Sequence, residues 1–425
     1  MNSMPAIGTS LRSYPVSSRN VFYAGVLLSL LTLSLPFTRL VSGVNLILFA
    51  VLFAVFAFLN RKAQKLPWAL SFFCLISLCY AVLSVFNVFP SVWTRYFQIS
   101  AIPQQALFAY AIPTTFLVMT FYFKERINAD DGRRGLANLF LLWVVMNYLD
   151  MLTSDAFSLK GLVSISGLGN VPALVIAATS LYLSTIKTPG KRVGLLLVFL
   201  AMSFLSPFSQ NKIYALIFAG MWLFPRYAFW MLVALISSSV ILYASTVGSP
   251  LSVAFIDANL AVRLVLLRDA LEGLVGSNFI GVGFGTESIR NYYLVFDSPV
   301  FANEEEAGFI HLSVHNSFAA IPFRVGLVGF IALLVFLWQT LMRVKTDGPH
   351  NEKALKCSLF AAFFIVSFQN PAIESYAYLY GVCMYLSLIW AFDRPVIEID
   401  KRLPVRRSGK DKLGAVQLWI HSRLR

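Results

Sequence analysis

Residues 317–341 read SFAAIPFRVGLVGFIALLVFLWQTL, and Arg324 is the only charged side chain among them. A helix needs about 20 apolar residues to cross the hydrocarbon core of a bilayer, so this stretch predicts a transmembrane helix. Similar runs recur along the chain, and together they predict about twelve spanning helices. The other runs are 21–37, 40–59, 67–88, 106–123, 136–152, 161–186, 193–207, 213–224, 228–246, 355–370 and 375–392.

The composition of the chain agrees with this interpretation. Of the 425 residues, 58% are hydrophobic and 13% are charged, whereas soluble domains average about a quarter charged residues. The expected fold class is therefore an all-α polytopic membrane protein. Residues 1–20 are polar and no small-residue cleavage site follows the run 21–37, so we expect that run to be the first membrane helix and not a removable signal.

The Lys and Arg residues alternate with the predicted spans. Of these 34 residues, 26 lie in the connections on one side or in the terminal segments, and 8 lie on the other side. Cytoplasmic loops of membrane proteins carry the excess of Lys and Arg, so both termini are expected in the cytoplasm. The net charge of +14 is then explained by segments that face membrane lipids, and nucleic acid is not an expected partner.

The expected organisation follows from these spans. A cytoplasmic N-terminus at 1–20 precedes helices 1–9 within 21–246, and helices 10–12 within 315–392 precede a basic cytoplasmic tail at 393–425. The connection at 247–314 is the one long external loop, and we expect it to pack on the helix bundle as a lid. No internal repeat at a fixed spacing is visible, which disfavours a transporter built from inverted repeats.

Residues 259–276 of the external loop predict an amphipathic helix, because five leucines fall on one stripe. Arg263 lies inside that stripe, where a guanidinium needs an anionic partner, so it is a candidate substrate-binding residue. Arg268 lies on the flank, four residues before Glu272, and is expected to form a surface ion pair with it. The five leucines are Leu260, Leu264, Leu267, Leu271 and Leu274.

The tenth predicted helix begins at His315-Asn316-Ser317-Phe318. Asn316 is well suited to cap this helix, and the free amide groups of the helix start can bind an anionic phosphate. The positive end of the helix dipole would keep His315 neutral and able to accept a proton. The alternative is a histidine that anchors the chain among the lipid headgroups.

Arg324 lies nine residues after His315, or about 13 Å along a helix. A charge at that depth in a membrane is costly and marks a substrate pathway or ligand site. The alternative is an ion pair of Arg324 with Asp150 or Glu374. Pro322 is expected to kink the helix nearby.

Two further cations, Lys212 and Arg290, lie on the external side. The glycine-rich segment Gly281-Val282-Gly283-Phe284-Gly285-Thr286 is interpreted as a turn, because it lacks both the spacing and the βαβ context of a dinucleotide site. No paired-cysteine, D-x-D or H-E-x-x-H pattern occurs, so neither a metal nor a cofactor is expected.

Several of these segments together resemble the O-antigen ligase/polymerase superfamily. In that pattern an arginine opens the external loop, G-x-G follows, and H-N-S-F or H-N-S-Y begins a helix that leads into G-L-x-G. The chain departs from the pattern at 209–212, where S-R-G is common, and at Arg324, where an acidic residue is common. The matching segments are Arg263, Gly281-Val282-Gly283, His315-Asn316-Ser317-Phe318, Gly326-Leu327-Val328-Gly329 and, as the family's G…N-P element, 166–172.

The resemblance implies a bacterial inner-membrane glycosyltransferase that acts at the periplasmic face without a metal. Its donor would be a glycan linked through pyrophosphate to undecaprenol. The acceptor would be another lipid-linked repeat unit in a polymerase, or lipid A–core in a ligase. We favour the polymerase for O-antigen, capsule or exopolysaccharide synthesis, with a chain-length regulator and a flippase as possible partners. A flippase or another transporter is the alternative from a different class.

In such an enzyme, His315 is the expected catalytic base for the acceptor hydroxyl. The pyrophosphate leaving group needs cations and a helix start to stabilise its developing charge. The candidate substrate-binding residues are Arg263, Arg290, Arg324, Lys212 and Asn316.

Overall fold

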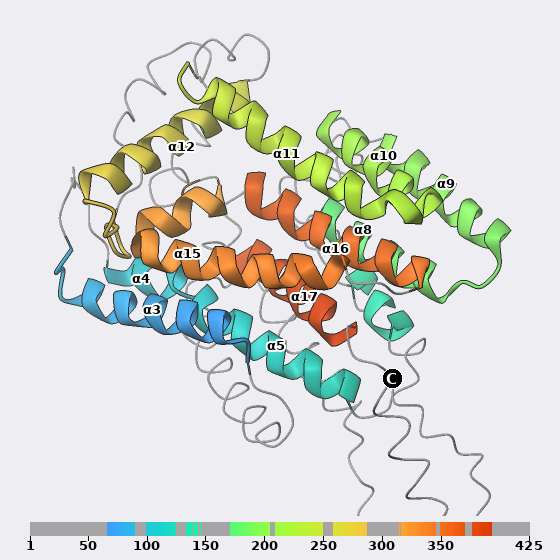
Figure 1. Ribbon diagram of the computed structural model, residues 1–425, viewed down its shortest axis with the longest axis horizontal. Helices are drawn as coiled ribbons and strands as arrows, with labels where there is room; N and C mark the ends of the chain where they lie inside the picture. Colours follow the sequence, from blue (N-terminus) through green and yellow to red (C-terminus); the bar gives the residue numbers. More distant parts are fainter. Residues whose placement is uncertain are drawn as a thin grey trace, which may run out of the picture. The chain divides into compact units, whose positions relative to one another are not determined.

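The computed structural model describes part of the chain, and every regular element within that part is a helix (Figure 1). The all-α prediction is therefore confirmed for these residues. Three helical segments are long and apolar enough to cross a membrane, namely Trp68–Val85, Pro225–Thr246 and Ser317–Lys345. The described residues are 66–89, 99–124, 133–138, 140–142, 145, 171–204, 209–249, 258–286, 314, 316–345, 349–369 and 376–392.

Nine of the predicted apolar runs contain a described helix. The runs 21–37 and 40–59 and most of 136–152 lie outside the described residues, so twelve spans stay a prediction. The helices in these runs are α3 (Trp68–Val85), α5 (Phe108–Lys124), α8 (Val171–Thr185), α9 (Pro189–Phe204), α10 (Ser209–Leu223), α11 (Ala228–Thr246), α15 (Ser317–Lys345), α16 (His350–Gln369) and α17 (Tyr376–Phe392). Short helical turns lie at α4 (Ile102–Gln105), η1 (Ile99–Ala101) and η3 (Pro225–Tyr227), and α12 (Ala258–Gly276) lies in the predicted loop.

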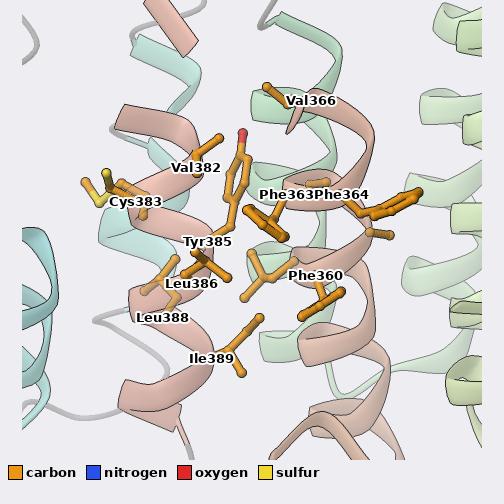
Figure 2. Close-up of a cluster of buried hydrophobic side chains, with 14 of the residues drawn as sticks. Phe360, Phe363, Phe364, Val366, Val382, Cys383, Tyr385, Leu386, Leu388 and Ile389 are labelled. Atoms are coloured by element: carbon orange, nitrogen blue, oxygen red, sulfur yellow. The ribbon is translucent and has the colours of Figure 1, made fainter. Parts of the chain in front are cut away.

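The helices pack in pairs around a shared apolar core. Helix α3 lies along α15, α5 lies along α17, and α16 contacts α8, α11, α15 and α17 (Figure 1). Figure 2 shows part of this core, where Phe360 and Phe363 of α16 lie beside Tyr385 and Leu386 of α17. In lipid, apolar side chains gain little by leaving the solvent, so close packing of this kind is what holds helices together.

Helix α12 confirms the predicted helix at 259–276, and its predicted apolar stripe is confirmed in part. Leu264 and Leu274 of that stripe are buried, whereas Leu271 is 42% exposed and the neighbouring Ala270 is buried instead. The reason is that α12 is covered on two sides. Leu264 belongs to the main core, and Ala270 belongs to a separate cluster with Ala319 and other residues at the start of α15.

Several predicted cytoplasmic connections meet at one end of the bundle, here called the basic end. Arg133 donates a hydrogen bond to Glu352 at 3.1 Å. Arg192 donates to the Asn351 side chain at 2.9 Å. These pairs join the connections before the fifth, seventh and eleventh predicted spans, which the charge pattern assigns to the same side. The contacts agree with the predicted alternation of basic loops, and the sidedness itself stays a prediction.

Candidate functional site

Helix α15 is interrupted within its first third. Val325 has φ −110° and ψ 15°, and Gly326 has φ 68° and ψ −177°, so neither is helical. The sequence predicted a kink at Pro322, but the non-helical dihedrals fall at these two residues instead. The physical reason is that the combination at Gly326 is open essentially to glycine alone.

The interruption frees backbone groups, and a distant segment binds them. In a regular helix the amide of Leu327 would donate to the carbonyl of Phe323. Here Leu327 donates to the carbonyl of Phe279 at 2.9 Å, and the carbonyl of Phe323 accepts from the amide of Val282 at 2.8 Å. Residues 279–286, here called the glycine strap, thus replace the missing helical hydrogen bond.

The glycines of the strap and of α15 are in direct backbone contact. A Cβ on Gly326 would lie 2.1 Å from the carbonyl oxygen of Ile280, and a Cβ on Gly281 would lie 2.5 Å from the amide nitrogen of Gly326. The segment interpreted above as an independent turn is therefore one packed unit with the G-L-x-G segment of α15. A separation of about 40 residues hides this relation in the sequence.

Helices α3 and α4 hold the other side of the strap. The Ser84 hydroxyl accepts a hydrogen bond from the amide of Phe284 at 2.8 Å, and the Gln105 side-chain oxygen accepts from the next amide at 2.6 Å. Tyr80 donates its hydroxyl to a strap carbonyl at 2.7 Å. Sequence reasoning missed these three residues, because a single serine, glutamine or tyrosine in an apolar run carries no local signal.

Arg324 is almost completely buried, with 1% of its surface exposed. Its Nη1 donates to the carbonyl of Thr286 at 2.6 Å and lies 3.5 Å from the carbonyl of Gly283. Its guanidinium also lies 5.0 Å from the ring centre of Phe323. The structure thus shows Arg324 bound to the strap, and its contact with a substrate stays a prediction.

Asn316 caps the start of α15, as the sequence predicted. Its side-chain oxygen accepts hydrogen bonds from the amides of Phe318 at 2.9 Å and Ala319 at 3.2 Å. A cap of this kind typically stabilises a protein by about 1 kcal/mol. The capped helix start carries the positive end of the helix dipole.

Arg263 is half-buried on α12. It lies within electrostatic range of the Tyr214 hydroxyl on α10, which is also close to that of Tyr243 on α11. Lys212 is half-buried two residues before Tyr214 on the same helix. The structure thus gives Arg263 an electrostatic partner on α10, the helix that also carries Lys212.

A row of aromatic rings connects this neighbourhood to the start of α15. The ring of Tyr243 meets the ring of Phe368 edge-on, with centres 4.5 Å apart. The rings of Phe368 and Phe318 have centres 6.2 Å apart, and Phe318 follows the Asn316 cap by two residues. Helix ends from α10, α11, α15 and α16 therefore meet at the same end of the bundle. These helix ends and the glycine strap are together called the strap end.

An apolar groove of about 450 Å³ begins beside this aromatic row. It lies between α11, α15 and α16, and its lining includes Phe318 near the start of α15 and Trp338 and Leu341 near the other end. The part of α15 beyond the interruption lines the groove from Ile331 to Leu341, about 15 Å of helix, and Phe318 reaches the groove from the first part of the helix.

The predicted surface pair on α12 is confirmed, since Arg268 lies 3.8 Å from Glu272. Sequence reasoning did not single out Asp269, whose side chain is fully buried next to this pair and 4.0 Å from Arg268. An aspartate between an arginine and an alanine gives no sequence signal of burial when the helix is covered on two sides.

The remaining predicted site residues, His315 and Arg290, lie outside the described residues, as do Asp150 and Glu374. Among the described residues, no group of three or more His, Cys, Asp and Glu side chains is arranged to hold a metal ion. No protein-family model and no curated protein matches this chain. The candidate site therefore stands on the geometry of the strap end and on the residues of the sequence motifs.

Proposed function

We propose that this chain is a metal-independent membrane glycosyltransferase that polymerises lipid-linked oligosaccharide repeat units. The donor would carry its glycan on undecaprenyl pyrophosphate, and the reaction would take place at the periplasmic face of a bacterial inner membrane. The supporting observation is that Gly281–Gly283 and Gly326, two separate parts of the motif pattern, form one packed unit. The helix that Asn316 caps, which follows His315 in the sequence, leads directly into that unit.

The proposed reaction breaks the bond between the sugar and the pyrophosphate and forms a new glycosidic bond. The acceptor hydroxyl loses its proton to His315 as it attacks the sugar carbon. The departing pyrophosphate carries the electron pair, and Arg263, Lys212, Arg290 and the amide groups at the start of α15 stabilise its charge. The apolar groove beside Phe318 would accommodate the hydrocarbon chain of the donor.

The second candidate is a ligase that transfers the same donor glycan to lipid A–core. The two activities differ in the acceptor, and deletion of the gene separates them by phenotype. Loss of a polymerase leaves single repeat units on the core, whereas loss of a ligase leaves a bare core. A transporter is disfavoured because the sequence shows no internal repeat at a fixed spacing and because most candidate residues belong to one predicted external loop or its border.

The deciding experiment incubates purified membranes with lipid-linked repeat units and follows chain extension on gels. His315→Ala should lower the rate by about 10²–10⁴-fold at unchanged protein level, since that is the usual contribution of a general base. His311→Ala is the matched control and should extend chains almost normally. Extension by His315→Ala at the unmodified rate would end the proposal that His315 is the base. Activity in His315→Gln but not in His315→Ala would make it an orienting residue instead.

A further inference from the structure

The amide groups of the glycine strap are all bound within the protein from 281 to 285. Those of Val282 and Gly283 donate to carbonyls of α15, and those of Phe284 and Gly285 donate to side chains of α3 and α4. The amide of Gly281 donates to the Ser277 hydroxyl at 3.0 Å. A glycine-rich loop that binds phosphate presents such amides to its ligand. The strap amides therefore bind α15 and neighbouring side chains, and the strap is not an anion-binding loop.

The strap decides how the first part of α15 is held. Because the helical hydrogen bond between Phe323 and Leu327 is replaced by bonds to the strap, the two parts of α15 are not fixed to each other by helix continuity. The first part, 317–324, begins two residues after His315. Any displacement of the strap would thus change where the start of α15 points.

Arg324 contacts the strap through both its main chain and its side chain. Its carbonyl accepts from the amide of Gly283 at 3.0 Å, and its Nη1 reaches the carbonyl of Thr286 at 2.6 Å. A hydrogen bond from a guanidinium is stronger than one between neutral groups. With 1% of Arg324 exposed, these contacts are shielded from water.

We propose that Arg324 is a positioning residue, which holds the strap in the interruption of α15 and thereby fixes the helix start next to His315. In this role it does not bind the pyrophosphate itself. The effect of Arg324 on the reaction rate rests on the proposed function, whereas its role in holding the strap against α15 does not. Two measurements therefore separate them.

The first measurement is hydrogen–deuterium exchange on the purified full-length protein, with Arg324→Met compared with the unmodified chain. Amides within 279–286 and 317–327 should exchange about tenfold to a hundredfold faster in the variant, because local opening becomes easier when this charged hydrogen bond is lost. Amides of α17 should be unchanged and serve as the internal control. Equal exchange of the strap in both proteins would overturn the inference, whatever reaction the protein catalyses.

The second measurement compares KM and kcat for the lipid-linked donor in Arg324→Lys and Gln105→Leu. Gln105 holds the strap from α4, so a positioning role predicts that both variants lower kcat, by about fivefold or more, while KM stays within about twofold. Lys212→Met removes a proposed contact to the donor pyrophosphate, so it should raise KM as well as lower kcat. A large rise of KM in Arg324→Lys together with normal kinetics in Gln105→Leu would identify Arg324 as a ligand of the pyrophosphate and refute the positioning role.

Inactivity of the unmodified chain with every lipid-linked donor would refute the proposed function alone. The exchange experiment would still decide whether Arg324 holds the strap.

Discussion

The strap end and the basic end of the bundle are held together by different chemical groups. At the strap end, backbone amides and carbonyls of 279–286 bind backbone groups of α15. At the basic end, side chains bind side chains, as in Arg133 with Glu352, or stack on rings, as in Arg343 at 3.7 Å from the ring centre of Trp390. Contacts between backbones require glycine at the points of closest approach, whereas contacts between side chains tolerate other pairs. The strap end should therefore be much less tolerant of substitution.

The largest expected contrast between the two ends is the compartment that each is predicted to face. We expect a reporter enzyme that is active only outside the cytoplasm to be active when fused after Pro299 and silent when fused after Arg407. Both fusions must be produced at similar levels for the comparison to hold. The opposite pattern would reverse the topology and remove the basis for periplasmic chemistry.

Substitution at the strap contact should have the largest effect on stability. Gly326→Ala places a Cβ 2.1 Å from the Ile280 carbonyl oxygen, at a residue with φ 68°. The loss of stability should be about 3 kcal/mol or more and should appear as a low level of folded protein in membranes. Gly194→Ala, in open space within α9, is the control and should be neutral or stabilising by about 0.5–1 kcal/mol. Equal levels of the two variants would contradict the backbone contact.

A smaller effect is expected at the basic end. Arg133 and Glu352 lie 3.1 Å apart, with side-chain exposures of 9% and 35%. A double-mutant cycle of Arg133→Ala and Glu352→Ala should give a coupling of about 1 kcal/mol, measured by unfolding of the purified protein in detergent. Additive effects of the two substitutions would show that this end is held by other contacts.

The smallest effect is expected for the exposed pair on α12. Glu272→Ala removes the partner of Arg268, at 3.8 Å, and both side chains are at least a third exposed. The expected cost is about 0.3–0.5 kcal/mol. Asp269→Ala, at the buried neighbouring position, should cost about 1–3 kcal/mol in the same thermal unfolding assay. If the order of the two costs were reversed, the assignment of the buried face of α12 would be wrong.

The features that could be predicted from the sequence are those encoded by neighbouring residues. Continuous apolar runs gave nine of the described helices, and the Asn316 cap and the pair of Arg268 with Glu272 depend on residues at most four positions apart. The same local reasoning was right only in part for α12, where Leu264 is buried and Leu271 is exposed, because two different neighbours set the buried face.

The strap could not be predicted because its contacts depend on residues far apart in the chain. The interruption of α15 depends on partners about 40 residues earlier, and the Ser84 and Gln105 contacts to the strap span 200 and 180 residues. A glycine permits an unusual backbone conformation but does not say which segment will occupy the space it leaves. Arg324 illustrates the same limit: its depth in an apolar run marked it as unusual, but its hydrogen-bond partners were not apparent.

The interruption of α15 has a consequence for how the protein is made. The strap groups that bind the freed backbone lie between Phe279 and Gly283, and the side chains of Ser84 and Gln105 hold the strap in turn. All of them precede residue 323 in the chain. Synthesis proceeds from the N-terminus, so these partners already exist when the interrupted helix leaves the ribosome. Backbone amides and carbonyls without hydrogen-bond partners are costly in lipid. The order of the segments thus allows the interruption to be filled as soon as α15 enters the membrane, without waiting for α16 or α17.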